Sequence, residues 1–248
     1  KEKVKNNVTK VDYSKFSHRP PMVHQKEAVK KLLEYDRFIL SDDMGLGKTT
    51  SAVLAAMISD SKKILILGGS GFLGNALYRE LLPYFNTHAT YYTDNATFES
   101  NFKFHQWDLE SEDVSILLEQ VKPNVIVSAL RGSFDAQVHQ HLSIINYILK
   151  NPCKLIFLSS ANVFDAFTNY PSYEYDKTLS ESVYGRFKIK IENALLRLPN
   201  NKYNICRLPM VFGAKSPRLI ELTEHYKNNV PFEVFPNVVI NAAAQKHV

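Results

Sequence analysis

Continuous hydrophobic runs alternate with segments of helical periodicity from residue 63 onward. Runs such as ILIL, VIV and LIFL carry no polar residue, which is typical of strands whose two faces are both covered by helices. The runs predict strands at 64–67, 89–93, 102–107, 124–129, 154–159 and 203–207. The intervening segments predict helices at about 72–84, 111–121, 135–150, 178–198 and 216–228. This alternation implies right-handed crossovers and an α/β fold built on a doubly wound, parallel sheet of the Rossmann type.

A second unit of the same kind precedes this region. Residues 22–35 (MVHQKEAVKKLLEY) have apolar positions at helical spacing, RFIL predicts a short strand, and TTSAVLAAMI predicts a helix after a glycine-containing loop. The polar link SDSK then leads into the strand at 64–67. We therefore expect two parts. Residues 1–61 form a partial P-loop strand–helix segment, and residues 62–248 form the Rossmann core.

Composition and charge exclude several function classes. Hydrophobic residues make up 45% and charged residues 22% of the 248-residue chain, as in ordinary soluble globular proteins. The net charge of +5 leans toward the N-terminal arm KEKVKNNVTK, which we interpret as a solvated end and not as a nucleic-acid-binding surface. No apolar run approaches the ~18–20 residues that span a bilayer, and the N-terminus lacks the apolar stretch of a signal peptide. We therefore expect a soluble cytoplasmic protein with no membrane partner.

The cysteines and histidines give no signal for a metal. Cys153 and Cys206 lie in apolar, strand-like runs without metal-ligand spacing, so we interpret them as reduced core residues. The eight histidines are scattered, and His139 and His141, two residues apart on a predicted helix, cannot share one face. No metal site is expected.

The sequence GGSGFLG, residues 68–74, follows a predicted strand and opens a predicted helix. Its glycines fit the loop that binds a dinucleotide pyrophosphate: the first allows the tight turn, the second allows the phosphates to approach, and the third allows the helix to pack on the strand. The helix N-terminus adds free N–H groups and a positive dipole end. A plain tight turn is the alternative. The candidate cofactor contacts here are Gly68, Gly71, Phe72, Leu73 and Gly74.

Three further residues carry the chemistry of an acid–base site. Tyr184 and Lys188 are one turn apart on a predicted helix, with Glu192 on the same face. An ammonium beside a phenol favours the phenolate and lowers its pKa, which makes the tyrosine usable as an acid or base. Ser160 ends a predicted strand, where α/β sheets bind ligands, and its hydroxyl is suited to hold a substrate oxygen. A surface Tyr–Lys pair and a serine that bonds its own turn are the alternatives.

These segments, in this order, resemble the extended short-chain dehydrogenase/reductase family. The resemblance covers roughly residues 63–235 and rests on the glycine loop, WDLES, NVIVSAL, SSANVF, YGRFK and RLPMVFG. It implies hydride chemistry with NAD or NADP through Ser160, Tyr184 and Lys188. Tyr184 would transfer the proton, and Lys188 would also anchor the cofactor ribose. It further implies that RLPMVFG lines the nicotinamide side.

The resemblance also sets expectations for the cofactor. It implies that Asp108, followed by Leu109, contacts the adenine. Asp94 follows the second predicted strand, in YYTDN, and is placed to bind a ribose hydroxyl. No Arg or Lys stands beside it to accept a 2′-phosphate, which favours NAD slightly over NADP.

The substrate expectation rests on the segment NVFD, with Phe164 and Asp165. This segment is most similar to the sugar-nucleotide reductase branch typified by dTDP-4-dehydrorhamnose reductase, which implies a small nucleotide-sugar substrate. Family members continue into a C-terminal substrate-binding lobe, whereas this chain ends soon after residue 235, so we expect that lobe to be truncated. A non-catalytic dinucleotide-binding module is therefore an alternative, and a homodimer stays open.

The upstream loop DDMGLGKTT has the character of a Walker A loop. Such a loop wraps its N–H groups around phosphates, with the lysine on the β/γ oxygens and the threonine on magnesium. Residues 20–60 resemble the start of Swi/Snf-type helicase-like ATPases, which implies that Gln25 reads the adenine. No apolar strand is followed by Asp-Glu, so ATP hydrolysis and nucleic-acid translocation are not expected, and weak ATP and Mg binding is the alternative. The candidate phosphate contacts are Gly45, Gly47, Lys48 and Thr49.

Overall fold

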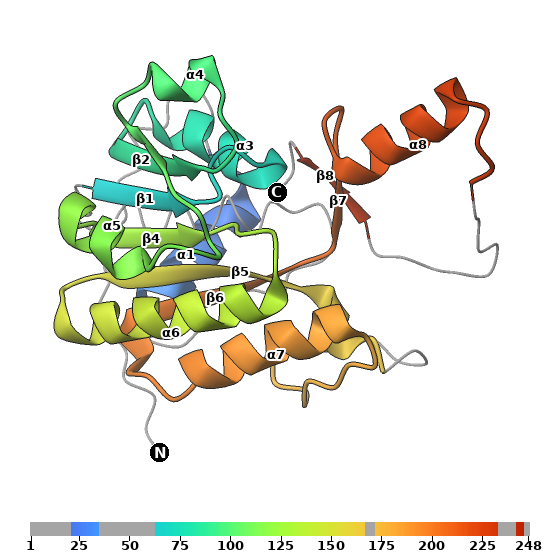
Figure 1. The fold of residues 1–248 in the computed structure, drawn as a ribbon. Helices are drawn as coiled ribbons and strands as arrows, with labels where there is room; N and C mark the ends of the chain where they lie inside the picture. Colours follow the sequence, from blue (N-terminus) through green and yellow to red (C-terminus); the bar gives the residue numbers. More distant parts are fainter. Residues whose placement is uncertain (1–20, 35–62, 167–171, 233–241, 246–248) are drawn as a thin grey trace.

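The computed structural model of the protein describes residues 21–34, 63–166, 172–232 and 242–245. A six-stranded parallel sheet forms its centre, with the strand order β3-β2-β1-β4-β5-β6 (Figure 1). The strands are β1 (Lys63–Leu67), β2 (Asn86–Tyr91), β3 (Phe104–Gln106), β4 (Val125–Ser128), β5 (Lys154–Ser160) and β6 (Tyr203–Leu208). The order reverses between β1 and β4, and such a reversal is where open α/β sheets bind ligands at the carboxyl ends of their strands. The predicted doubly wound sheet is confirmed.

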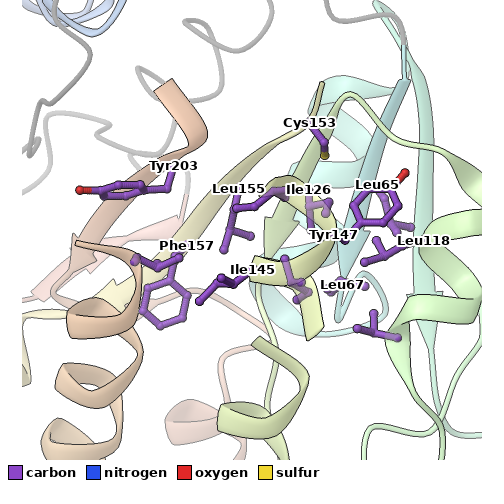
Figure 2. Close-up of a cluster of buried hydrophobic side chains, with 14 of the residues drawn as sticks. Leu65, Leu67, Leu118, Ile126, Ile145, Tyr147, Cys153, Leu155, Phe157 and Tyr203 are labelled. Carbon is purple, nitrogen blue, oxygen red and sulfur yellow. The ribbon is translucent and has the colours of Figure 1, made fainter. Parts of the chain in front are cut away.

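Three helices cover one face of the sheet. They are α5 (Val114–Val121), α6 (Phe134–Lys150) and α7 (Val183–Leu195). Figure 2 shows the core beneath them, in which Leu65, Ile126 and Phe157 of the strands lie near Leu118 and Ile145 of the helices. These strand side chains are fully buried, which explains why the sequence of the strands shows no polar alternation.

The opposite face is packed by α3 (Phe72–Leu81) and α1 (Val23–Glu34). Leu81 of α3 and Val29 of α1 lie in one buried cluster with Ile64 and Ile66 of β1. The helix α1 therefore packs on the same sheet, although it precedes the alternating region of the sequence. The division of the chain at residue 61 stays a prediction.

Side-chain caps set the starts of two helices that the sequence pattern places too early. The side chain of Asp113 accepts a hydrogen bond from the N–H of Ser115, so α5 begins after it and not at residue 111. The hydroxyl of Ser182 accepts from the N–H of Gly185 at 3.0 Å, so α7 begins after it and not at residue 178. The third strand is also shorter than predicted, because Phe102 lies in a turn with 83% of its surface exposed.

The remaining elements lie outside the six-stranded sheet. They are α4 (Ala96–Glu99), η2 (Ala161–Phe164), η3 (Asn200–Lys202), β7 (Met210–Phe212), α8 (Pro217–Lys227) and β8 (Ala242–Ala244). β7 and β8 pair in parallel, and α8 lies near this pair, away from the large sheet (Figure 1). The sequence pattern predicts α8 but not α4, β7 or β8.

The cysteines are as expected from the sequence. Cys153 and Cys206 are free and buried, and burial raises the pKa of the Cys153 thiol to about 12. No helix in the described ranges is long and apolar enough to cross a membrane. Among the same residues, no three His, Cys, Asp or Glu side chains gather where they could hold a metal ion.

Candidate active site

The glycine loop is a compact turn between β1 and α3. Gly68 has a φ of +79°, and its N–H donates to Oγ1 of Thr90 on β2 at 2.8 Å. A Cβ atom at Gly68 would stand 2.6 Å from the carbonyl oxygen of Ala129, which follows β4. The loop therefore lies where the strand order reverses, and its first glycine is required both by its backbone angle and by the approach of β4.

The start of α3 is open for an anion. Gly71 is the residue before the helix and offers no side-chain cap. The N–H groups of the first helical turn, at Phe72, Leu73 and Gly74, have no partner within the helix. A helix N-terminus of this kind binds phosphate through its N–H groups and its dipole. The residues present therefore fit a dinucleotide pyrophosphate.

The two candidate carboxylates of the cofactor site lie past the ends of β2 and β3. Asp94 is exposed, and its Oδ1 accepts a hydrogen bond from Nε2 of Gln106 at 2.7 Å. Asp108 accepts from the N–H of Glu110 at 2.9 Å and from the hydroxyl of Ser111 at 2.7 Å, and these bonds lower its pKa. Through these hydrogen bonds, Asp108 holds the turn that follows it. Leu109, the next residue, is buried.

Ser160 and Tyr184 meet at the carboxyl end of β5. Ser160 is the last residue of this strand, and its hydroxyl donates to Oδ1 of Asn162 at 3.0 Å. Tyr184 lies in the first turn of α7 and is 40% exposed. Burial raises the pKa of the Tyr184 phenol above its usual value, and a hydrogen bond with Ser160 and the charge of Arg131 partly offset this effect.

Lys188 follows Tyr184 by one turn of α7. It is 5% exposed, and its ammonium donates to the carbonyl oxygen of Leu158 at 2.9 Å. Burial lowers the pKa of Lys188 to about 8, against the attraction of Glu192. Its Nζ lies 5.8 Å from the ring centroid of Tyr184.

The expected lowering of the Tyr184 pKa is wrong for this structure. The sequence predicts a lowered phenol pKa, whereas the pKa is raised, with burial as the largest cause. The ammonium of Lys188 bonds the carbonyl of Leu158 and makes no hydrogen bond to the phenol among the described contacts. The groups that lower the Tyr184 pKa are Ser160 and Arg131.

Sequence reasoning missed several residues at this site. Phe134, at the start of α6, stacks on Phe187 with ring centroids 4.3 Å apart and meets the ring of Tyr184 edge-on at 5.9 Å. Arg131 lies three residues earlier in the same connection. Both residues follow β4 at the sheet end that binds ligands, and this position is the signal that could have identified them.

The candidate ATP contacts lie mostly outside the part of the chain that the structure describes. Gly45, Gly47, Lys48 and Thr49 lie outside the described residues. Gln25 is in the first turn of α1, where its Oε1 accepts from the N–H of Met22 at 2.9 Å. This bond gives Gln25 a local role at the start of the helix.

Comparison with known proteins places this geometry in a family. Residues 62–226 match the family described as RmlD substrate binding domain. The match begins after the Walker A-like loop, so it gives no support to the ATPase resemblance of residues 20–60.

Two curated relatives carry the same name. Methionine adenosyltransferase 2 subunit beta from Mus musculus is 29% identical over 167 residues, which cover 62% of this chain and 48% of the mouse protein. The protein of that name from Rattus norvegicus is 30% identical over 167 residues, with the same coverage. This chain therefore spans about half the length of the curated relatives that it matches.

Solved structures share the fold at low sequence identity. A UDP-galactose 4-epimerase has a TM-score of 0.59 and 18% identity, over 74% of this chain and 68% of that chain. The dTDP-glucose 4,6-dehydratase of Bacillus anthracis, solved in complex with NAD, has a TM-score of 0.55 and 17% identity, over 67% and 62%. A hypothetical dTDP-4-dehydrorhamnose reductase from Sulfolobus tokodaii has a TM-score of 0.54 and 20% identity, over 62% and 58%. These likenesses show a common α/β fold.

Proposed function

The chain belongs to the RmlD substrate binding domain family, and from this premise we propose that it is an NAD(P)-dependent oxidoreductase of sugar nucleotides. It reduces a carbonyl of a nucleotide sugar, or oxidises the corresponding alcohol, through Ser160, Tyr184 and Lys188. The observation that carries the proposal is the arrangement at the carboxyl end of β5: Ser160 ends the strand, its hydroxyl lowers the pKa of Tyr184, and Lys188 is buried one turn along α7.

Each of the three residues has a role that its surroundings support. The hydroxyl of Ser160 donates a hydrogen bond to the substrate oxygen and holds it beside Tyr184. Tyr184 gives its proton to that oxygen in the reduction and takes it back in the oxidation. Lys188 contributes a cation near the phenol and a donor for the cofactor ribose. The bound nicotinamide supplies or accepts the hydride.

The protonation state of Tyr184 near neutral pH suits it to donate a proton. Because burial raises its pKa, the phenol is neutral at pH 7 and carries the proton that a general acid must donate. In the oxidation, Tyr184 must act as a base. Because its pKa is raised, little phenolate is present near neutral pH to play this role.

The cofactor site that we propose comprises the glycine loop and the two carboxylates. Gly68, Gly71 and the first turn of α3 hold the pyrophosphate, with Phe72, Leu73 and Gly74 as the first helical residues. Asp94 accepts a hydrogen bond from a ribose hydroxyl, which makes NAD the better cofactor. Asp108 and Leu109 line the adenine. The structurally similar dehydratase was solved in complex with NAD, which supports a dinucleotide cofactor.

A second candidate function is a dinucleotide-binding subunit without reductase turnover. The names of the two curated relatives favour it, because both are described as a subunit of a methionine adenosyltransferase. In that case the cofactor fold serves assembly or regulation of another enzyme, and Tyr184 need not exchange a proton.

Cofactor titration followed by a turnover assay separates these functions. NADH and NADPH fluorescence is titrated with the wild type and with Gly71→Trp, which fills the approach to the start of α3. Equal binding by both proteins contradicts the glycine-loop assignment. Binding by the wild type, followed by nucleotide-sugar reduction that Tyr184→Phe abolishes, supports the oxidoreductase. Binding with no turnover on any nucleotide sugar supports the binding subunit.

A further inference from the structure

A buried ion pair lies one helical turn beyond Lys188. The side chains of Glu192 and Arg207 are 1% and 6% exposed, and Nη2 of Arg207 donates to Oε2 of Glu192 at 2.7 Å. Nε of Arg207 lies 3.2 Å from Oε1 and 3.3 Å from Oε2 of the same carboxylate. The hydroxyl of Ser159 donates to Oε1 at 2.5 Å. Both carboxylate oxygens are therefore hydrogen-bonded, as a buried charge requires.

The ion pair fastens α7 to two neighbouring strands at one point. Ser159 of β5 and Arg207 of β6 are partners in the parallel register, and both bond Glu192 of α7. Nη1 of Arg207 also donates to the carbonyl oxygen of Glu174 at 3.3 Å, and its guanidinium stacks 4.8 Å from the ring centroid of Phe164. The position of the carboxylate is thus fixed from several directions.

Three successive residues at the end of β5 are each associated with one residue of α7. The carbonyl of Leu158 accepts from Lys188, the hydroxyl of Ser159 donates to Glu192, and the next residue, Ser160, lowers the pKa of Tyr184. Because Lys188 and Glu192 share one face of α7, rotation of the helix would break both hydrogen bonds together.

The charge of Lys188 depends on its neighbours. Burial favours the neutral amine and lowers the pKa of Lys188 to about 8, whereas Glu192 favours the ammonium. The other titratable groups around it are Tyr184 on the same helix and His141 on α6, whose pKa burial lowers to about 4 with a smaller contribution from the charge of Lys188. Arg207 on β6 is held by Glu192. Among these residues around Lys188, Glu192 carries the negative charge.

We propose that Glu192, balanced by Arg207 and buried one turn along α7 from Lys188, is a positioning residue of the active site: it keeps the buried Lys188 cationic. Glu192 touches no reacting atom and acts through Lys188. Arg207 neutralises part of the carboxylate charge, so the two side chains together set how strongly the ammonium is favoured. The inference deepens the oxidoreductase function proposed above, in which Lys188 must be cationic.

A purely structural ion pair would give a different result on substitution. A buried pair contributes little net stability, and the loss of either partner is destabilising in the same direction. The electrostatic role instead predicts opposite effects on Lys188. Glu192→Gln removes an anion and lowers the pKa of Lys188, whereas Arg207→Gln leaves the anion uncompensated and raises it.

The test is a nuclear magnetic resonance titration of Lys188 in protein labelled at its lysine side chains, with Lys188→Arg used to assign the signal. We expect Glu192→Gln to move the Lys188 midpoint to lower pH by about one unit, and Arg207→Gln to move it to higher pH. Glu221→Gln is the matched control, because Glu221 forms an exposed ion pair with Arg218 on α8 and is expected to leave the midpoint unchanged. Unfolding curves establish that each variant is folded.

The double variant Glu192→Gln, Arg207→Gln serves if a single variant does not fold, because it removes both charges and leaves two amides that can bond each other. Its midpoint is expected between those of Glu192→Gln and the wild type. Midpoints that do not move, or that move in the same direction in both single variants, overturn the inference.

The titration needs no substrate, so its outcome is independent of turnover. If the protein is an active reductase and the Lys188 midpoint does not move in the variants, the role of Glu192 is overturned and the proposed reaction is not. If the midpoints shift as expected but the protein reduces no nucleotide sugar, the proposed reaction is overturned and the role of Glu192 is not. In an active reductase, the basic limb of the kcat profile of Glu192→Gln is expected to move to lower pH with the Lys188 midpoint.

Discussion

Gly74 packs against Gly68 so closely that a Cβ atom on Gly74 would overlap the carbonyl oxygen of Gly68. The first turn of α3 thereby rests on the end of β1. Gly71, between them, is different: a Cβ atom there would meet the Gly68 oxygen at 3.2 Å, and the φ of Gly71 is −73°, which any residue adopts. The same loop therefore has a glycine that packing requires, Gly74, and one, Gly71, whose backbone angle does not require glycine.

The first prediction separates these two glycines. Gly74→Ala is expected to lower the free energy of unfolding by about 1–3 kcal/mol, because the backbone of the turn must move to admit the methyl group. Gly71→Ala is expected to change it by less than about 1 kcal/mol and to weaken dinucleotide binding more than it weakens the fold. Urea unfolding and cofactor fluorescence measure the two effects. Equal destabilisation by both substitutions would contradict the packing role of Gly74.

The second prediction concerns the pH dependence of stability. His141 is fully buried between Oγ of Ser128, at 2.9 Å, and the carbonyl oxygen of Gln137, at 2.6 Å, and burial lowers its pKa to about 4. An unfolded histidine titrates near 6.5, so the neutral ring stabilises the fold fully above pH 6.5, and this stability is lost as the pH falls toward 4. Between pH 7 and pH 5, His141 alone is expected to account for a loss of about 1–2 kcal/mol.

Urea unfolding at several pH values provides the measurement for this prediction. The variant His141→Gln should show a smaller loss of stability between pH 7 and pH 5 than the wild type, whatever its stability at pH 7. His139→Gln is the control on the same helix, because His139 is exposed, and it should keep the wild-type slope. An unchanged slope in His141→Gln would refute the assignment to His141.

The existence of the sheet and helices could be predicted from the sequence, whereas their limits and the electrostatics of the site could not. Runs such as LIFL identify buried strands by themselves. The start of α7 is set by the cap from Ser182 and the helix ends at Leu195, so periodicity alone predicts a helix that is too long at both ends. The meeting of Ser160 and Tyr184 follows from the parallel order of the sheet. The direction of the Tyr184 pKa does not, because it depends on how deeply the folded chain buries the phenol.

The third prediction concerns Ser160 and the acidity of Tyr184. The neighbouring Ser160 hydroxyl lowers the pKa of Tyr184 against the effect of burial. Ser160→Ala is therefore expected to raise that pKa further and to lower kcat for nucleotide-sugar reduction by about 10²-fold. Ultraviolet difference titration of the phenolate, with Tyr184→Phe as the reference, measures the first effect without substrate. Ser160→Thr keeps the hydroxyl and should retain most activity. A Tyr184 pKa that does not change in Ser160→Ala would disprove the contact.

The last prediction concerns the carboxylate that holds the start of α7. Asp165 accepts hydrogen bonds from the hydroxyls of Ser180, at 2.9 Å, and Ser182, at 2.6 Å, and from the N–H of Glu181 at 2.7 Å. Burial alone would raise the pKa of Asp165, but these bonds lower it. Since Ser182 caps α7 two residues before Tyr184, the carboxylate fixes the position at which the phenol enters the site.

Asp165→Ala is expected to lower the free energy of unfolding by about 1–3 kcal/mol and to reduce kcat, because the cap of α7 loses its support. Asp165→Asn should keep part of the stability and part of the kcat, since its amide oxygen still accepts a hydrogen bond. Asp176→Ala is the matched control: this carboxylate accepts from the N–H of Tyr173 in its own exposed turn, and its loss should leave kcat unchanged. The stabilisation from Asp165 is present while the carboxyl is ionised and is lost as the pH falls through its lowered pKa, so the difference between the wild type and Asp165→Ala should shrink in acid. A difference that stays constant down to the acid limit would show that packing, and not the ionised carboxylate, supports the start of α7.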